Sequence, residues 1–424
     1  MPEIKPFPAL RYNAKKVQLD EVVAPPYDVI SEQQQDELYR RNPYNVIRLV
    51  LGREDNRYAS AVSSLEEWKK QQLIISDSSP ALYVLSQRYS LAGGETIDRY
   101  GFIAGCRLAE FGKAGVYAHE KTHSKPKEDR FQLFRATGAM FSQIFSIYSD
   151  PGKQIDRLLE QTMQGPALAE VMFEGIHNRL WRIDDLSSVV SIQQYLNQQN
   201  VFVADGHHRY ETALAYSTLR RSQNPHHSGN EAYNFVPMFF TNMNNGGLVV
   251  LPTHRVLHDS IDFDAVKFIE KLQQYFHCAS FESLALLSEA LTKEKQCAFG
   301  VVLSGNSYSL LRVKNLHWYE GMGVPPILAQ LDVTLLHALV FKHVLRISED
   351  DQDSKRFLGY EKDAQQAVDL VQHGKAQAAF LLNPTRIDQV RTIAEAGLVM
   401  PQKSTYFYPK LLSGLVMYSF LDQR

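Results

Sequence analysis

The sequence predicts a mixed α+β fold whose second half is more helical than its first. Between residues 201 and 216 an apolar strand runs into a tight turn and then a helix. Residues 81–91 and 96–108 alternate apolar and polar side chains on either side of a Gly-Gly turn, which is typical of a β-hairpin. From about residue 259 onward, helical periodicity dominates.

The other elements follow from the same periodicities. An amphipathic helix is expected over residues 58–73. Residues 111–128 are polar and contain Gly112, Gly115 and Pro126, so they predict a long loop before a helix over 129–137. Strands are expected at 140–149, 177–184, 233–243, 247–257, 296–304, 308–314 and 377–384, and helices at 152–162, 191–199, 263–276, 282–293 and 331–345.

Composition narrows the class of protein. The 424 residues are 44% hydrophobic and 22% charged, which is ordinary globular composition and excludes a disordered chain. The 45 Lys and Arg nearly balance the 47 Asp and Glu, so there is no global basic field and we expect no nucleic-acid partner. The three cysteines show no metal or disulfide spacing, and no segment predicts a secretory signal or a membrane span. These features favour a cytoplasmic protein, and no pattern indicates its oligomeric state.

The turn after the apolar strand carries the clearest chemical signal. Gly206 lets a ligand approach the main chain, and the following helix start presents N–H groups to an anion. His207, His208 and Arg209 add side-chain donors suited to phosphate oxygens. Asp205 would repel an anion unless it holds Mg²⁺ or acts as a base, and both roles fit phosphoryl transfer. The structural alternative is that Asp205 only caps the helix.

A second polar segment, from His119 to His123, matches the H-E-x-x-H pattern of zinc proteases. That chemistry requires a helix, whereas Gly115 precedes the pattern and Pro126 follows it, so we expect no zinc site. As a loop, the segment places six cationic or potentially cationic side chains near one another and predicts contact with an anion, although a solvated charged loop would have the same composition. These residues are His119, Lys121, His123, Lys125, Lys127 and Arg130, with Glu120 among them as a candidate base.

Weaker signals complete the set. Asp28 follows the rigid pair Pro25-Pro26 and could be either a helix cap or a catalytic carboxylate. His254 and Arg255 end a predicted strand. A polar cluster near the C-terminus would either line a pocket or end a domain; it contains Lys403, Ser404, Thr405 and Lys410. P-loop, Rossmann and α/β-hydrolase motifs are all missing from the sequence.

Six blocks taken together identify a family resemblance. APPYDVI, NPYNVIRL, HEKTHSKPKEDR, FVADGHHRYETAL, LVVLPTHR and MPQKSTYFYPK, in this order, resemble the bacterial and archaeal domain-of-unknown-function family 1015 over nearly the whole chain. The DGHHR turn also resembles the phosphate-binding turn of the ParB and sulfiredoxin superfamily, which includes kinases of free serine. The resemblance implies a ParB/sulfiredoxin-like nucleotide-binding core at residues 1–258, with an inserted strand meander, and a mixed α/β lobe at 259–424 packed on it.

The same resemblance implies phosphoryl transfer from ATP or ADP to free L-serine, giving O-phosphoserine, with Mg²⁺ as cofactor. An anion-binding turn and a cationic segment are the features such a transfer requires. On this hypothesis the turn residues Gly206 to Arg209 bind nucleotide phosphates, and Asp205 holds Mg²⁺ or acts as the base, with Asp28 and Glu120 as alternatives. Four cations would contact the terminal phosphate or the amino-acid carboxylate: Lys121, Lys125, Lys127 and Arg130.

Two other functions remain open at this stage. His207 and Glu211 are one helical turn apart and could share the metal of a phosphohydrolase. ParB-like folds also serve as non-enzymatic, nucleotide-gated DNA-binding modules, but the near-neutral charge argues against this function.

Overall fold

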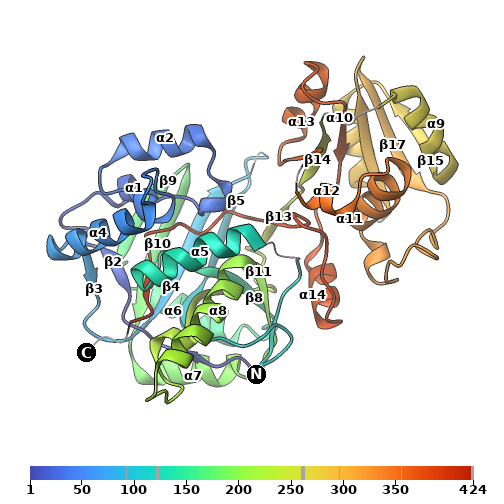
Figure 1. The fold of residues 1–424 in the computed structure, drawn as a ribbon. Coiled ribbons are helices and arrows are strands. Elements are labelled where there is room, and N and C mark those ends of the chain that lie inside the picture. Colours follow the sequence, from blue (N-terminus) through green and yellow to red (C-terminus); the bar gives the residue numbers. More distant parts are fainter. Residues whose placement is uncertain (92, 121–123, 259–262, 296, 355, 422–424) are drawn as a thin grey trace. The chain divides into compact units, whose positions relative to one another are not determined.

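The computed structural model describes residues 1–91, 93–120, 124–258, 263–295, 297–354 and 356–421. The chain forms two compact units, both of mixed helix and sheet, as the sequence predicted (Figure 1). The first unit contains residues 1–118, 122–249 and 409–424. The second contains residues 119–121 and 250–408, and the chain passes from one to the other within β13 (Val249–Leu251).

The first unit is built on a nine-stranded mixed sheet with the order β6-β11-β8-β12-β5-β4-β10-β9 and β1 paired to β5. Every residue of β12 is buried, as expected of a central strand covered on both faces. The predicted hairpin is confirmed as the antiparallel pair β4–β5. The strands are β1 (Ile4–Lys5), β4 (Leu82–Ser90), β5 (Thr96–Arg107), β6 (Val116–Tyr117), β8 (Ile144–Tyr148), β9 (Ala169–Phe173), β10 (Ile176–Ile183), β11 (Val201–Asp205) and β12 (Phe235–Asn242).

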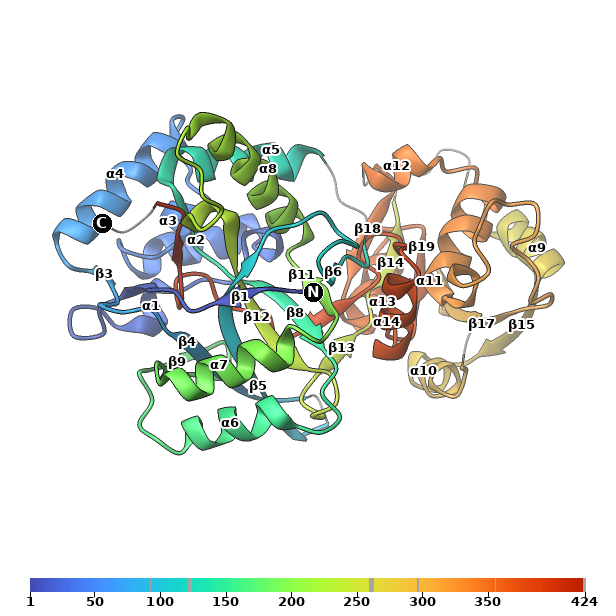
Figure 2. The same ribbon diagram turned by 90° about the horizontal axis from the view of Figure 1, so that it is seen from below.

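Helices cover both faces of this sheet. Figure 2 shows α6 (Gln154–Met163) and α7 (Leu186–Leu196) on one face, with α5 (Ser124–Thr137) and α8 (His207–Gln223) on the other. The pairing of β21 (Tyr418–Ser419) with β7 (Ala139–Met140) attaches the C-terminal segment to this unit. The remaining elements are α1 (Leu19–Val22), η1 (Tyr27–Val29), α2 (Glu32–Arg41), α3 (Ile47–Val50), α4 (Arg57–Lys70), η2 (Ala232–Asn234), β2 (Leu10–Tyr12) and β3 (Ile74–Ser76).

Three expectations about the first unit are corrected. The predicted loop at 111–128 contains β6 and the start of α5, which begins at Ser124 because a proline is tolerated in the first turn of a helix. Helix α7 begins before residue 191 because the Asp185 carboxylate accepts a hydrogen bond from the Ser188 amide at 2.8 Å. Asp28 does not cap α2, whose N-cap is Ser31.

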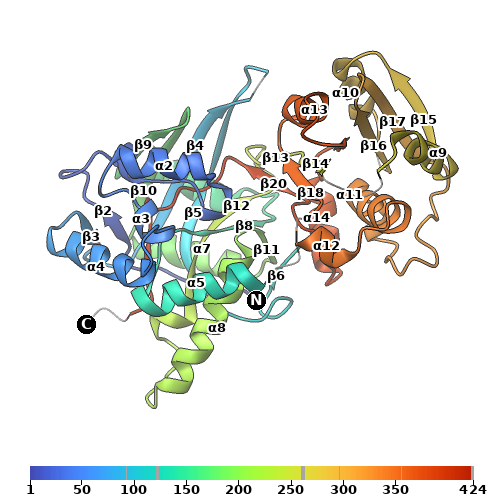
Figure 3. The same cartoon turned by 45° about the horizontal axis from the view of Figure 1, so that its top comes forward.

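The second unit is a six-stranded antiparallel sheet covered on both faces. The order is β15-β17-β16-β19-β14-β18, and successive side chains of β16 alternate between two hydrophobic clusters. Helices α10 and α13 pack on one face, and α9, α11, the π-helix η4 and α14 pack on the other (Figure 3). The strands are β14 (His254–Leu257), β15 (Phe276–Phe281), β16 (Ala298–Leu303), β17 (Ser307–Val313), β18 (Leu358–Glu361), β19 (Ala378–Leu381) and β20 (Tyr406–Tyr408). The helices are α9 (Ala265–Tyr275), α10 (Leu284–Thr292), η3 (Leu328–Gln330), α11 (Asp332–Leu335), η4 (Leu336–Val344), α12 (Glu349–Asp353), α13 (Ala364–Gln372) and α14 (Ile387–Glu395).

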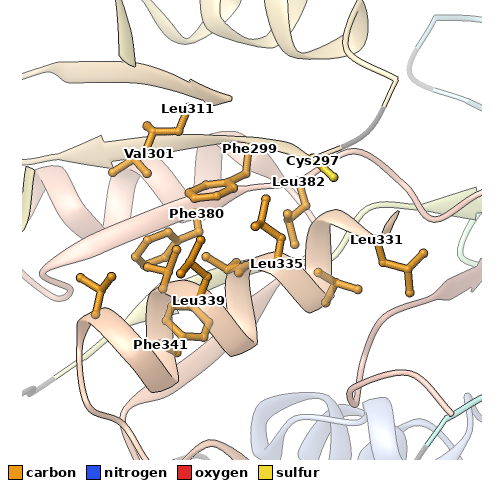
Figure 4. Close-up of a cluster of buried hydrophobic side chains, with 14 of the residues drawn as sticks. Cys297, Phe299, Val301, Leu311, Leu331, Leu335, Leu339, Phe341, Phe380 and Leu382 are labelled. Atoms are coloured by element: carbon orange, nitrogen blue, oxygen red, sulfur yellow. The ribbon is translucent and has the colours of Figure 1, made fainter. Parts of the chain in front are cut away.

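The segment predicted as one α-helix at 331–345 is instead one α-helical turn followed by η4. Leu335, Leu339 and Phe341 from this segment point into the same core as Phe299 and Phe380 (Figure 4). The rings of Phe341 and Phe380 meet edge to face with centroids 5.0 Å apart. π-Helices are rare and concentrate at functional sites, and apolar periodicity alone does not distinguish them from α-helices. None of the helices in the described part of the chain has the length and apolar character of a membrane span.

Removing the Phe380 ring tests this core. Phe380→Ala is expected to lower the free energy of unfolding of the second unit by about 3–5 kcal/mol, because it leaves a cavity among fully buried side chains. The matched control is Val266→Ala, since Val266 is 70% exposed and its loss should cost less than about 0.5 kcal/mol. Urea unfolding curves measure both, and equal midpoints for the two variants would contradict the assignment of this core.

Candidate anion-binding site

The site in the first unit starts at the end of β11. Residues Val201 to Ala204 are buried between the helical layers, and the register against β8 shifts between Val203 and Asp205. Such a bulge redirects the side chain that follows it. Gly206 then adopts φ +91°, a left-handed conformation that other residues rarely take, and α8 begins at the next residue. The predicted strand, turn and helix are therefore confirmed.

Asp205 is the centre of the site. One carboxylate oxygen lies 2.8 Å from Nη2 of Arg209, and the other lies 2.6 Å from Nζ of Lys410. Arg209, only 4% exposed, also donates from Nη1 to the Ser142 hydroxyl at 2.8 Å and to the Gln143 carbonyl at 2.7 Å. These contacts join α8, the segment before β8 and the C-terminal segment at one point.

A second buried guanidinium lies close to this carboxylate. Arg99 donates to the Gln87 side chain and to the Pro409 carbonyl, and it lies 4.5 Å from the centre of the Phe145 ring. Burial lowers the pKa of Arg99 to about 10, and the charges of Tyr89 and Asp205 act in the opposite direction. Arg99, Arg209 and Lys410 thus place three cations around one carboxylate, an arrangement that attracts an anion.

Tyr27 and Arg130 form the adjoining wall. The guanidinium of Arg130 lies 4.1 Å from the Tyr27 ring centre. Burial and the nearby Asp28 charge raise the pKa of Tyr27 to about 12, while Arg130 and Arg209 oppose the rise. A cavity of about 10 Å³, enough for one water, lies among the Tyr27, Arg130 and Arg209 side chains. Asp28, the residue after Tyr27, is exposed.

Two other cations predicted in this region, Arg130 and Lys127, pair with carboxylates. Arg130 pairs with its neighbour Asp129, and Lys127 lies 3.1 Å from the Glu211 carboxylate. Lys121 and His123 lie outside the described residues, and for Lys125 only the backbone in α5 is described.

The residues predicted to hold metal ions contact other side chains instead of sharing a metal site. Glu211 contacts Lys127, and His207 is buried beside the Phe111 ring. Within the described ranges no three His, Cys, Asp or Glu side chains gather as metal ligands. Asp205 does not fit a direct Mg²⁺ ligand in this arrangement, because each of its oxygens already contacts a cation.

His119 and Glu120 belong to the second unit, so the predicted cationic segment is divided between the two units. Glu120 accepts hydrogen bonds from the Thr405 amide at 3.0 Å and the Thr405 hydroxyl at 2.9 Å. Since that hydroxyl donates to Glu120, the His119 Nε2–H donates to the Thr405 oxygen at 2.9 Å. This network fixes the conformation around Thr405.

The remaining predicted pocket residues also lie in the second unit and stabilise the same segment. Arg255 donates to the carbonyls of Gln402 and Lys403, each at 3.1 Å, and the Ser404 hydroxyl donates to a neighbouring carbonyl. His254 accepts a hydrogen bond at Nδ1 from the Leu382 amide at 3.2 Å.

Sequence reasoning missed Arg99, Tyr27 and Ser142 as parts of the site and treated Lys410 only as part of a polar cluster. Only Arg99 could have been found from the sequence, because it is a charged residue within the alternating strand 96–108. The other two carry no local pattern that distinguishes them.

A mixed sheet with a cationic strand–turn–helix site defines a candidate anion-binding protein. The chain belongs to the family described as a protein of unknown function (DUF1015), whose model matches residues 4–334. A comparison with curated proteins found no match.

Solved structures similar to this chain share little sequence with it. A conserved hypothetical protein from Pyrococcus furiosus is 13% identical, with 70% of this chain and 90% of that chain covered and a TM-score of 0.35. A free serine kinase in complex with AMP is 12% identical, with coverage of 70% and 88% and a TM-score of 0.36. SbnI with a C-terminal truncation, from Staphylococcus aureus, is 12% identical, with coverage of 71% and 83% and a TM-score of 0.34. TM-scores this low assign no function to the chain.

Alanine substitutions at Gly206 and Gly229 test how closely the turn at Gly206 packs against Arg209. A Cβ at Gly206 would lie 2.9 Å from Nη2 of Arg209, whereas Gly229, at a similar φ of +92°, has nothing within 4 Å of its Cβ position. Gly229→Ala is expected to cost about 1–2 kcal/mol in unfolding free energy from backbone strain alone. Gly206→Ala should cost clearly more, because the Arg209 guanidinium must also move. Equal losses in thermal or urea unfolding would contradict a tight fit between the turn and Arg209.

His254 predicts a pH dependence of stability. Burial, and then the Arg255 charge, lower the pKa of His254 from 6.5 to about 4. Above pH 6.5 the imidazole is neutral in both states, and as pH falls below 6.5 the unfolded chain takes up a proton that the folded chain does not. The wild type should therefore lose about 1.5 kcal/mol between pH 6.5 and pH 5 through this group. His254→Asn keeps an acceptor for the Leu382 amide and should lose less over the same range; an identical loss would argue against the effect.

Proposed function

We propose that the first unit is a small-molecule kinase that transfers a phosphoryl group from ATP or ADP to free L-serine, giving O-phosphoserine. The observation that carries the proposal is the pair of cations, Arg209 and Lys410, held on one carboxylate at a left-handed turn before a helix. Membership of the DUF1015 family and the resemblance of the DGHHR turn to the ParB/sulfiredoxin turn support it. On this proposal residues 1–258 contain the nucleotide-binding core.

Phosphate oxygens would replace Asp205 as the partner of the two cations. The Arg209 fork suits two phosphate oxygens, and the amides at the start of α8 add donors on the positive end of the helix dipole. His207 and His208 lie at the same helix end. Asp205 then acts as a positioning residue, because in the absence of ligand it holds Arg209 and Lys410 where the phosphate will bind.

The chemical step needs a proton acceptor. The bond between the terminal phosphorus and the oxygen of the leaving nucleotide breaks, a new bond forms from the serine hydroxyl oxygen, and the hydroxyl proton passes to a base. We assign this base to Asp28, an exposed carboxylate that follows Tyr27, whose ring lies against the Arg130 guanidinium. Glu120, which the sequence offered as another base, lies in the second unit and accepts hydrogen bonds from Thr405, so it has no role in this proposal. Arg130 or Lys127 would bind the serine carboxylate, and Mg²⁺, for which the described side chains offer no ready site, would enter with the nucleotide.

The decisive assay incubates purified protein with Mg²⁺, ATP or ADP, and free hydroxy amino acids, with products read by mass spectrometry. O-Phosphoserine is expected, and Arg209→Ala or Lys410→Ala should reduce its rate by about 100-fold or more, as loss of a charge-stabilising donor does. Arg220→Gln, near the other end of α8, is the control that should leave the rate unchanged.

Asp28→Asn separates chemistry from binding. It should lower kcat while nucleotide affinity, measured by calorimetry, stays near that of the wild type. Near-native transfer by Arg209→Ala would refute the assigned phosphate site, and no product with any acceptor would refute the kinase.

A further inference from the structure

The second unit contains a cavity of about 670 Å³ that the proposed kinase does not use. Its volume lies in the range of small-molecule sites. The π-helix η4, residues 321–325 and helix α12 contribute walls, and every lining residue belongs to the second unit. Most of the cavity follows residue 334, where the family match ends. The apolar part of the wall includes Met322, Val324, Pro325, Leu328 and Val399.

One wall is fixed by a chain of hydrogen bonds through His337. Arg255 donates from Nε to His337 Nε2 at 3.3 Å, so the ring proton is on Nδ1, which donates to Gln352 Oε1 at 2.8 Å. The Gln352 amide nitrogen donates in turn to the Ile347 carbonyl at 3.0 Å. His337 and Gln352 therefore present a rigid surface to the cavity.

Thr334 supplies a buried polar group for which the described part of the chain offers no partner. It lines the cavity and is 6% exposed, and its hydroxyl finds no hydrogen-bond partner among the described atoms. Leaving a buried hydroxyl in this state costs free energy, because its hydrogen bonds to water are lost and not replaced. A ligand atom that hydrogen bonds to it would remove that cost.

The charge at the cavity is positive. Lys342 lies 2.5 Å from Glu349, so these two charges balance each other. Arg346 is exposed and, among the described side chains, has no acidic partner within 4 Å. It also adopts φ +61°, a strained conformation for a residue with a side chain. Such strain is concentrated at ligand sites.

We propose that this cavity binds a compact organic anion with an apolar body. The body would pack against Met322, Val324 and Pro325, the carboxylate or phosphate group would lie near Arg346, and an acceptor atom would reach the Thr334 hydroxyl. The cavity is lined by residues of the second unit alone, whereas the proposed kinase residues lie in the first unit. Its success or failure is therefore independent of phosphoryl transfer.

The aromatic sulfonate anilinonaphthalene sulfonate tests the proposal on the folded full-length chain. We expect saturable fluorescence with one site per chain. Phenyl phosphate or phenylacetate should displace the dye, and neutral benzyl alcohol should not. If one acid displaces the dye more strongly than the other, its phosphate or carboxylate is identified as the preferred group. If neither acid displaces the dye, or if the alcohol displaces it equally well, the proposal is overturned.

Three variants locate the binding. Arg346→Gln should lower the affinity of the cavity for the dye and for the competing acid about fivefold, which is the effect expected from losing one exposed charge. Lys271→Gln, an exposed cation of the same unit that does not line the cavity, is the matched control. Ala338→Leu places a larger side chain in the cavity and should also reduce affinity. Unchanged affinity in both Arg346→Gln and Ala338→Leu would overturn the proposal, and kinase activity should be the same in all three variants.

Discussion

The carboxylate of Asp205 is the charge on which the first unit's site depends. Arg209 and Lys410 come from segments far apart in the sequence, and each cation reaches the same carboxylate. Buried cations are costly unless an anion compensates them, so Asp205 keeps α8, β11 and the C-terminal segment together. The nearby Arg99 leaves positive charge in excess even with Asp205 ionised. The Asp205 carboxylate thus compensates part of this positive charge, and the remainder favours a further anion.

In the second unit, one helical segment contributes both to the hydrophobic core and to the wall of the cavity. One side of the segment from Asp332 to Val344 fills the core around Phe380, which fixes Leu335, Leu339 and Phe341. The other side carries Thr334, His337 and Ala338 along the cavity wall. A π-helix changes the angular spacing of side chains, so one segment meets both requirements without a break in the helix.

Local patterns account for what the sequence predicted well. The β4–β5 hairpin and the turn at Gly206 depend on residues adjacent in the chain, so alternation and glycine placement were sufficient. Helix starts were less predictable, because the start of α7 depends on one capping side chain, Asp185, and α5 begins before a proline, which on its own indicates a loop. The partners of Arg209 could not be predicted, because Ser142 and Lys410 reach the site only through the sheet order and the returning C-terminal segment. The apolar pattern of 331–345 likewise contains no signal that separates an α-helix from a π-helix.

The return of the C-terminal segment has a consequence for biosynthesis. Asp205 and Lys410 are separated by 205 positions, and the whole of the second unit's main segment is translated between them. At about 5–20 residues per second, the ribosome needs about 10–40 s to pass from one to the other. A nascent chain therefore carries the DGHHR turn for that time without Lys410 and without the β7–β21 pairing. The first unit starts folding first and is completed last, so premature termination anywhere in the second unit leaves the proposed phosphate site without one of its cations.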